Sequence, residues 1–200
     1  SQGLQNGIGS FILIKTETNM RIQKDNILIR TATVDDAVQL NKWWNDGRVM
    51  EHAGFPYGLG ESLEDTIENI KKSDEFNQLC IIEIDGKAVG ELSYKIRGDT
   101  AYPGCKICDF DYQNKGYGTK IILMLFEFLF TDETINSKCR IERIAWDTML
   151  ENKRAQHVYE NKIRARRVGV RKDCWKDQTG RLRTAVDYEI RREDFMSDKN

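Results

Sequence analysis

A short loop with two glycines, set between two apolar runs, most constrains the fold of this 200-residue chain. The loop Gln113–Thr119 follows a strand-like run, 105–110, and precedes a nearly all-apolar helical run, 121–130. Backbone amides at the start of a helix have no partner within the helix, and the helix dipole there favours negative charge. Gly116 and Gly118 lack the Cβ that would shield these amides. The loop therefore predicts a cradle for a diphosphate.

Two other glycine motifs fit this segment poorly. A dinucleotide fingerprint requires a third glycine where Ile121 stands. A Walker A loop requires Gly-Lys-Ser/Thr, whereas Gly118 is followed by Thr119 and Lys120 in the opposite order. From the glycines alone, an ordinary tight turn that binds nothing is the alternative.

A second motif lies downstream, in the segment Asn152–Glu160. It has the pattern Asn-x-x-Ala-x-x-x-Tyr-Glu and follows the loop by about one βαβ unit. With these two motifs in this order, the chain resembles the GNAT N-acetyltransferases from about Ile27 to Phe195. Within that family it is most similar to the branch of ribosomal-protein N-terminal acetyltransferases and aminoglycoside 6′-N-acetyltransferases.

The apolar pattern predicts a mixed α/β (α+β) chain. Ile27–Arg30 is expected as the first strand, and Thr33 with Asp36 predicts a capping box that opens a helix. In that helix Val34, Val38, Leu40 and Trp44 are expected to face inward. Asp85 and Gly86 predict a tight hairpin, and 101–110 and 141–147 are expected as parallel strands on either side of the apolar helix.

The resemblance implies a GNAT fold. Such a fold has a mixed, mostly antiparallel sheet of six to seven strands, about four flanking helices, and a V-shaped splay between the fourth and fifth strands. We expect residues 20–200 to form one domain of this kind. Residues 1–19 lack a clear amphipathic period and are expected to be an N-terminal appendage or an expression remnant.

Composition sets limits on the partners and the compartment. The formal net charge of −1 gives no global attraction to nucleic acid or to an anionic membrane. No run approaches the roughly 18 apolar residues of a membrane span. Five scattered cysteines indicate a reducing, cytoplasmic setting. Cys105 and Cys108 lie three apart on an expected strand and point to opposite faces, so no metal site is predicted.

The resemblance implies that the chain binds acetyl-CoA. Main-chain groups near the end of the strand before the loop would hydrogen-bond the pantetheine arm, the loop would hold the diphosphate, and the asparagine of the second motif would also bind the cofactor. The residues in question are Asp109 and Phe110 for the arm, Gln113, Asn114, Lys115, Gly116, Tyr117, Gly118 and Thr119 for the diphosphate, and Asn152.

Two side chains are candidates for acid–base chemistry. Tyr159 occupies a position where the family commonly has a tyrosine that protonates the CoA sulfur, and its ordinary pKa of about 10 suits a thiolate of similar basicity. Packing in the core is its alternative role. Asp147 matches a carboxylate position in the same relatives and is the candidate base, acting through water or by orienting the amine. Its alternative role is to cap the following loop. Glu91 is the reserve base.

The loop between the first two expected helices is the candidate acceptor site. The side chains expected there or facing it are Trp44, Glu51, His52, Phe55, Tyr57 and Glu91. Core packing of the aromatics and an exposed His52 are the alternatives.

The function implied by the resemblance is acetyl-CoA-dependent N-acetyl transfer to a primary amine by direct nucleophilic attack. The acceptor is a protein N-terminus or a small amine such as an aminoglycoside or a polyamine. A homodimer is compatible with this function. The alternative is a non-catalytic acyl-CoA-binding sensor or interaction module.

One departure from the family pattern affects the acceptor side. Relatives have Tyr-Glu-x-x-Gly-Phe where this chain has Tyr159-Glu160-Asn161-Lys162-Ile163-Arg164. The absent glycine removes the easy left-handed end of the helix, so either Asn161 takes that conformation or the helix continues.

Overall fold

The computed structural model describes residues 19–197. The expected appendage, residues 1–19, lies almost wholly outside this range. The strands are β1 (Arg21–Lys24), β2 (Ile27–Thr31), β3 (Asn77–Ile84), β4 (Lys87–Arg97), β5 (Thr100–Ile107), β6 (Arg143–Met149), β7 (Arg166–Lys176) and β8 (Leu182–Arg191). The helices are η1 (Val34–Asp36), α1 (Ala37–Trp44), α2 (Gly47–Met50), η2 (Glu51–Ala53), α3 (Leu63–Lys71), η3 (Phe110–Tyr112), α4 (Tyr117–Thr131), α5 (Glu133–Lys138), α6 (Lys153–Asn161) and α7 (Arg192–Ser197).

All eight strands form one sheet in the order β1-β2-β3-β4-β5-β6-β8-β7. Only β5 and β6 pair in parallel, and the other neighbours are antiparallel. This confirms the mixed, mostly antiparallel GNAT-like architecture. The sheet has one strand more than expected because Arg21–Lys24 pairs with β2, so the ordered fold begins before Ile27.

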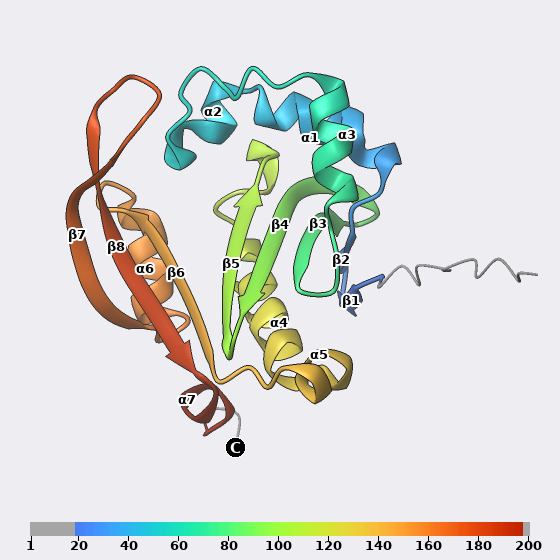
Figure 1. The fold of residues 1–200 in the computed structure, drawn as a ribbon, viewed down its shortest axis with the longest axis vertical. Coiled ribbons are helices and arrows are strands. Elements are labelled where there is room, and N and C mark those ends of the chain that lie inside the picture. The colour runs from blue at the N-terminus through green and yellow to red at the C-terminus, as the bar shows by residue number, and fades with distance from the viewer. Residues whose placement is uncertain (1–18, 198–200) are drawn as a thin grey trace, which may run out of the picture.

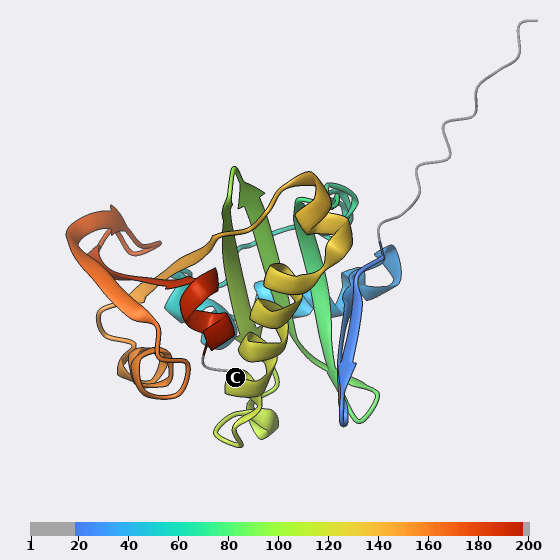
Figure 2. The same cartoon turned by 90° about the horizontal axis from the view of Figure 1, so that it is seen from below.

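The splay is the feature that creates the site. β5 and β6 pair at only two positions, Thr100 with Arg143 and Ala101 with Ile144, and then diverge. Figure 1 shows the two strands meeting at one end and separating toward α2. In Figure 2 the group of β6, β8, β7 and α6 stands apart from the strands β1–β5. Counted from β2, the splay lies between the fourth and fifth strands, as predicted.

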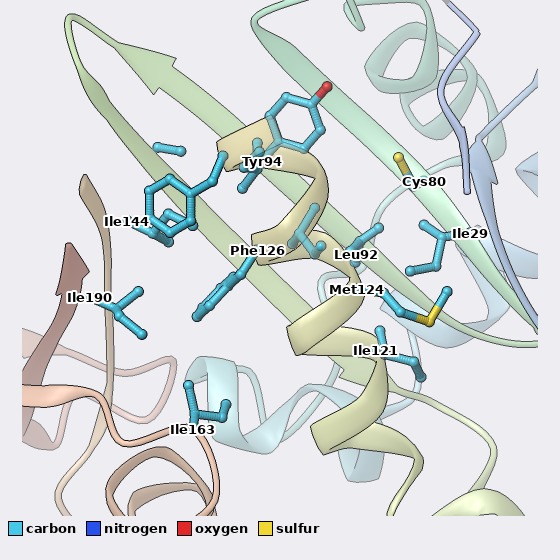
Figure 3. Packing of buried hydrophobic residues seen from close by; sticks show 14 of the residues in the cluster. Ile29, Cys80, Leu92, Tyr94, Ile121, Met124, Phe126, Ile144, Ile163 and Ile190 are labelled. Atoms are coloured by element: carbon cyan, nitrogen blue, oxygen red, sulfur yellow. The ribbon is translucent and has the colours of Figure 1, made fainter. Parts of the chain in front are cut away.

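Alternating side chains of β3 place a core on each face of the sheet. Cys80, Ile82 and Ile84 belong to the cluster that includes α4, whereas Ile81 belongs to the cluster with α1. On α4, Phe126 is 1% exposed and lies between Leu92 of β4 and the residues Ile144 and Ile190 beyond the splay (Figure 3). This helix therefore joins the two halves of the sheet where they meet.

Local signals explain most element boundaries. Asp85 (φ 52°) and Gly86 (φ 77°) form the expected two-residue hairpin between β3 and β4. The side chains of Ser62, Asp132 and Asn152 accept hydrogen bonds from the first turns of α3, α5 and α6.

Three expectations about local structure need correction. Thr33 and Asp36 do form a capping box, but they open the short helix η1, and Val34 and Val38 are 50% and 70% exposed. Leu40 and Trp44 face the core as expected. The strand β5 ends at Ile107, before Asp109 and Phe110, because the Asp109 side chain caps η3.

The chain leaves α6 without the family's glycine. The helix continues through Asn161, and the left-handed residue is Arg164 (φ 59°). The amide N–H groups of Lys162 and Ile163 donate to the Val158 carbonyl, and that of Ala165 donates to Tyr159. These hydrogen bonds hold an arginine in a conformation that glycine adopts more easily.

Candidate active site

A cleft of about 1010 Å³ opens where β5 and β6 diverge. Its walls come from α2 and η2, the middle of β4 and β5, the start of α4, β6 with the start of α6, and Trp175 of β7. Strands that end their pairing early leave a gap that no ladder fills, so the splay itself makes the space. The volume is in the range of clefts that enclose small ligands.

The loop before α4 carries a row of free amides at the edge of this cleft. Among the described residues, the backbone N–H groups of Asn114–Thr119 have no hydrogen-bond acceptor, whereas that of Gln113 donates to the Phe110 carbonyl at 3.2 Å. Asn114 (φ 59°) and Gly116 (φ 83°) turn the chain through left-handed conformations into α4. Unpaired amides at the N-terminus of a 15-residue helix form an anion-binding site.

Gly118 leaves room on the cleft side of this loop. Its φ is not left-handed, and a Cβ built on it would contact only Ile107 Cδ1, at 3.9 Å. Neither backbone conformation nor protein packing therefore requires a glycine here. Gln113, Gly118 and Thr119 line the cleft. Asn114–Tyr117 are outside its lining.

Two cations lie close to this loop. The Lys115 Nζ is 5.8 Å from the centre of the Tyr112 ring. Arg154, which lines the cleft, donates from Nη1 to the Gln113 Oε1 at 3.3 Å. Sequence reasoning included Lys115 but missed Arg154, although Arg154 lies within the second motif, because its hydrogen bond to Gln113 joins segments 41 residues apart in sequence.

Asp109 lies elsewhere than predicted. Its N–H donates to the Val89 carbonyl at 2.9 Å, and its carbonyl accepts from the Tyr112 N–H at 3.1 Å. Its carboxylate pairs with Lys87 at 2.7 Å, and this cation lowers the pKa of Asp109. The predicted main-chain contact of Asp109 with a ligand is therefore not supported, whereas Phe110 does line the cleft.

Asn152 is both a cleft residue and the cap of α6. It lines the cleft, and its side-chain oxygen accepts a hydrogen bond from the Ala155 N–H at 3.1 Å, which caps α6. The cap fixes the start of the helix that carries Tyr159.

Tyr159 of α6 and Cys105 of β5 both line the cleft. The Tyr159 ring packs edge-on against Trp146, with centroids 5.4 Å apart, and against Tyr188 at 5.3 Å. Burial raises the pKa of Tyr159, with smaller contributions from Cys105, Tyr188 and Asp147. The phenol therefore stays protonated at neutral pH. It makes no hydrogen bond to another described residue, so its proton is available to a ligand.

The cleft carboxylate Asp147 is already ion-paired. Arg171 of β7 contacts both Asp147 of β6 and Asp187 of β8. Asp147 remains 54% exposed and lines the cleft. Sequence reasoning missed Arg171 because the pairing of β7 with β8 contains two irregularities that no local pattern indicates.

A second carboxylate lies on the opposite wall. Glu91 is 12% exposed and accepts hydrogen bonds from the Trp44 Nε1 at 2.9 Å and the Lys106 Nζ at 3.1 Å. Glu91 and Lys106 lie directly opposite each other on β4 and β5, and both line the cleft. Trp44 is buried and does not line it. Trp44 therefore positions Glu91, and the structure gives no support to a direct contact of Trp44 with a substrate.

The expected acceptor loop is only partly at the cleft. Glu51 and His52 line it, with the His52 Nε2 and the Glu51 Oε1 3.8 Å apart. Phe55 and Tyr57 are 37% and 75% exposed and are absent from the lining.

The tip of the β7–β8 hairpin binds this loop. The Gln178 side chain accepts from the Tyr57 N–H at 2.9 Å and donates to the Gly58 carbonyl at 2.8 Å, while its backbone N–H donates to Gly54. A Cβ at Gly54 would lie 2.3 Å from the Trp175 ring. The hairpin and loop therefore join above one end of the cleft, a long-range contact that the sequence analysis did not predict.

Within residues 19–197, no group of three or more His, Cys, Asp or Glu side chains is arranged to hold a metal ion. None of the described helices has the length and apolar character needed to cross a membrane.

Comparison with known proteins gives one family and a consistent fold. A family model described as an acetyltransferase (GNAT) domain matches residues 26–162, more than half of the chain. A spermidine N-acetyltransferase from Vibrio cholerae, solved with CoA and spermine, is 18% identical with a TM-score of 0.74 and covers 86% of this chain and 99% of its own.

Two further structures are similar. A GNAT-family acetyltransferase from Bacillus anthracis is 24% identical with a TM-score of 0.70, covering 87% of this chain and 99% of its own. A ribosomal L7/L12 α-N-protein acetyltransferase, solved with coenzyme A, is 15% identical with a TM-score of 0.72, covering 86% and 98%. At these identities the likeness concerns the fold.

Proposed function

The chain belongs to the GNAT acetyltransferase family, and on that premise we propose that it transfers an acetyl group from acetyl-CoA to a primary amine. The observation that carries this proposal is the sharing of one cleft by two features. The free amides of Gly118 and Thr119 belong to residues that line one part of it, and the protonated phenol of Tyr159 belongs to a residue that lines another.

The loop fits the diphosphate of coenzyme A. The unpaired N–H groups of Asn114–Thr119 supply donors, Lys115 and Arg154 supply positive charge, and Gly118 leaves space for close approach. The splay gives the pantetheine arm a route past Cys105, where β5 has no partner on the β6 side. Binding at this many points orients the donor relative to the amine, an effect worth several kcal/mol.

Acetyl-CoA supplies an activated acyl group, which the amine attacks directly with no covalent enzyme intermediate. Tyr159 is the proposed general acid for the departing thiolate, because its protonated phenol lines the cleft and has no hydrogen-bond partner among the described residues. Trp146 and Tyr188 hold its ring in place through edge-on contacts.

The two cleft carboxylates suit an orienting role. Asp147 is paired with Arg171, and Glu91 with Lys106 and Trp44. Each oxygen that already accepts from a cation is a poor direct acceptor for an ammonium proton, so we assign Asp147 to orienting the amine or a water that takes the proton. Glu91 is the reserve for the same task.

The end of the cleft near Glu51, where we place the acceptor, favours an amine that carries further positive charge. Glu51 lines the cleft, and its only ion-pair partner among the described residues is His52. A carboxylate without a lysine or arginine partner attracts a cationic substrate. A polyamine or an aminoglycoside fits this end better than a neutral amine, and a protein N-terminus is the other acceptor to test.

A thiol-release assay with acetyl-CoA and a panel of amines tests the proposal. The panel contains spermidine, an aminoglycoside and a short peptide with a free N-terminus. Acceptor-dependent thiol release is the expected result. Coenzyme A binding without release from any amine class would favour the non-catalytic module.

A tyrosine pair then tests the general acid. We expect Tyr159→Phe to lower kcat by about 10²–10⁴-fold with coenzyme A affinity nearly unchanged. The matched control is Tyr102→Phe, because Tyr102 is an exposed residue of β5 outside the cleft lining. Normal turnover in the Tyr159 variant would remove the acid role.

A further inference from the structure

A second cavity lies on the α4 side of the sheet, away from the splay. Its volume is about 510 Å³. One face of α4 contributes Lys120, Leu123, Met124 and Glu127, spaced as i, i+3, i+4 and i+7. The other walls are the end of β1, the connection between α6 and β7, the end of β8, and α7. None of these residues lines the first cleft.

The floor of this cavity is apolar. Its most buried members are Ile27, Met124, Ile163, Ile190 and Phe195, each at most 8% exposed. A floor of this kind favours an apolar ligand body over a bare inorganic ion.

The rim of the cavity is mainly cationic. Lys24, Lys120, Lys162 and Arg164 reach it from three separate parts of the chain, against the two acids Asp25 and Glu127. Within residues 19–197, none of the three lysines makes an ion pair. Three lysines without an ion-pair partner among the described residues, set over an apolar floor, are complementary to an anion with an apolar body.

Arg164 gives a second and independent indication. It is held at φ 59°, where glycine or asparagine fits without strain, and three backbone hydrogen bonds to the end of α6 fix this part of the chain. A strained arginine that lines a cavity indicates a role for its side chain.

We propose that this second cavity binds a small organic anion, with its acidic group among Lys120, Lys162 and Arg164 and its apolar body on the floor. The site is separate from the acetyl-transfer cleft and does not depend on the function proposed for it.

Calorimetric titration with 8-anilinonaphthalene-1-sulfonate tests this site in the full chain. Saturating coenzyme A is present, so that the first cleft is occupied. We expect one equivalent to bind, and we expect Lys162→Gln/Arg164→Gly to weaken binding at least about tenfold. The glycine is suited to the left-handed position, so this variant should fold, and its Tm measured without the dye checks this. Lys172→Gln, on the exposed part of β7, is the control that should bind as the wild type does.

The neutral dye N-phenyl-1-naphthylamine separates charge recognition from apolar adsorption. It has a similar aromatic body without the sulfonate, and we expect its affinity to be at least about tenfold lower. The proposal would be overturned if the two dyes bound with equal affinity, or if the double variant kept wild-type affinity. It would also be overturned if adding coenzyme A abolished all binding of the sulfonate dye. Failure of acetyl transfer in the amine panel would leave these results unaffected.

Discussion

Replacing Gly118 by alanine should have opposite effects on the stability of the fold and on the affinity for coenzyme A. In a helix, alanine is more favourable than glycine by roughly 0.5–1 kcal/mol. The new Cβ would meet only Ile107, at an ordinary contact distance of 3.9 Å, so packing adds little cost. For a domain of this size, we expect the Tm to rise by roughly 1–4 °C.

The same methyl group should weaken coenzyme A binding. Gly118 lines the cleft beside the free amides, so its Cβ would occupy space that a bound phosphate needs. Losing one hydrogen bond to a charged group costs about 1.5–3 kcal/mol, which corresponds to roughly 10- to 150-fold in Kd. Thermal unfolding and calorimetric titration with coenzyme A measure the two effects on one preparation.

Two other glycines serve as matched controls. Gly116→Ala should lower the Tm, since φ there is +83° and a left-handed alanine costs about 1–2 kcal/mol. Gly169→Ala on β7 has an ordinary φ and its Cβ would contact only Asp187, at 3.8 Å, outside the cleft, so coenzyme A affinity should not change. Wild-type affinity in Gly118→Ala would show that no phosphate approaches this residue and would refute the proposed cradle.

Two predictions concern the β7–β8 hairpin tip. Thr179 and Arg183, with backbone N–H donors, lower the pKa of Asp177 to about 2. Its charged form therefore stabilises the fold above pH 4, and this contribution is lost as the pH falls from about 4 to 2. Asp177→Asn should lower the Tm at pH 7 and flatten the Tm profile between pH 4 and 2; an unchanged profile would contradict this. Gln178→Ala removes two hydrogen bonds to the loop at Tyr57 and Gly58, so it should raise the KM for the amine and leave coenzyme A affinity unchanged. A change in coenzyme A affinity alone would contradict the assignment of this loop to the acceptor end of the cleft.

Local signals predicted much of the fold. The hairpin at Asp85 and Gly86, the Ser62 cap and the buried apolar helix after Gly118 all depend on residues close together in sequence, and each has a specific physical cause. The pattern failed at Val38. An apolar residue at the expected period became 70% exposed because the capping box opened a short 3-10 helix, and α1 began only at Ala37.

The local structure of the two segments proposed to bind the cofactor was predictable for the same reason. The loop Gln113–Thr119 and the helix from Asn152 to Tyr159 are each continuous segments. Their local structure therefore depends on neighbouring residues and can be predicted from the residue pattern. Asp109 shows the limit of this reasoning. Its distance from the cleft is set by the hydrogen bond from its N–H to Val89 and by the pairing with Lys87, and these partners lie about twenty residues away in sequence.

The acceptor side was the least predictable part because strands distant in sequence build it. Lys106 meets Glu91 through the register of β4 with β5, and Arg171 meets Asp147 only because β8 lies between their strands. Each of these cations decides whether a carboxylate is a free base or an ion-paired group. The sequence therefore identified two carboxylates that line the cleft but could not show that both are already paired. That pairing is the physical reason for assigning them to orientation and for placing acid catalysis on Tyr159, whose phenol has no such partner among the described residues.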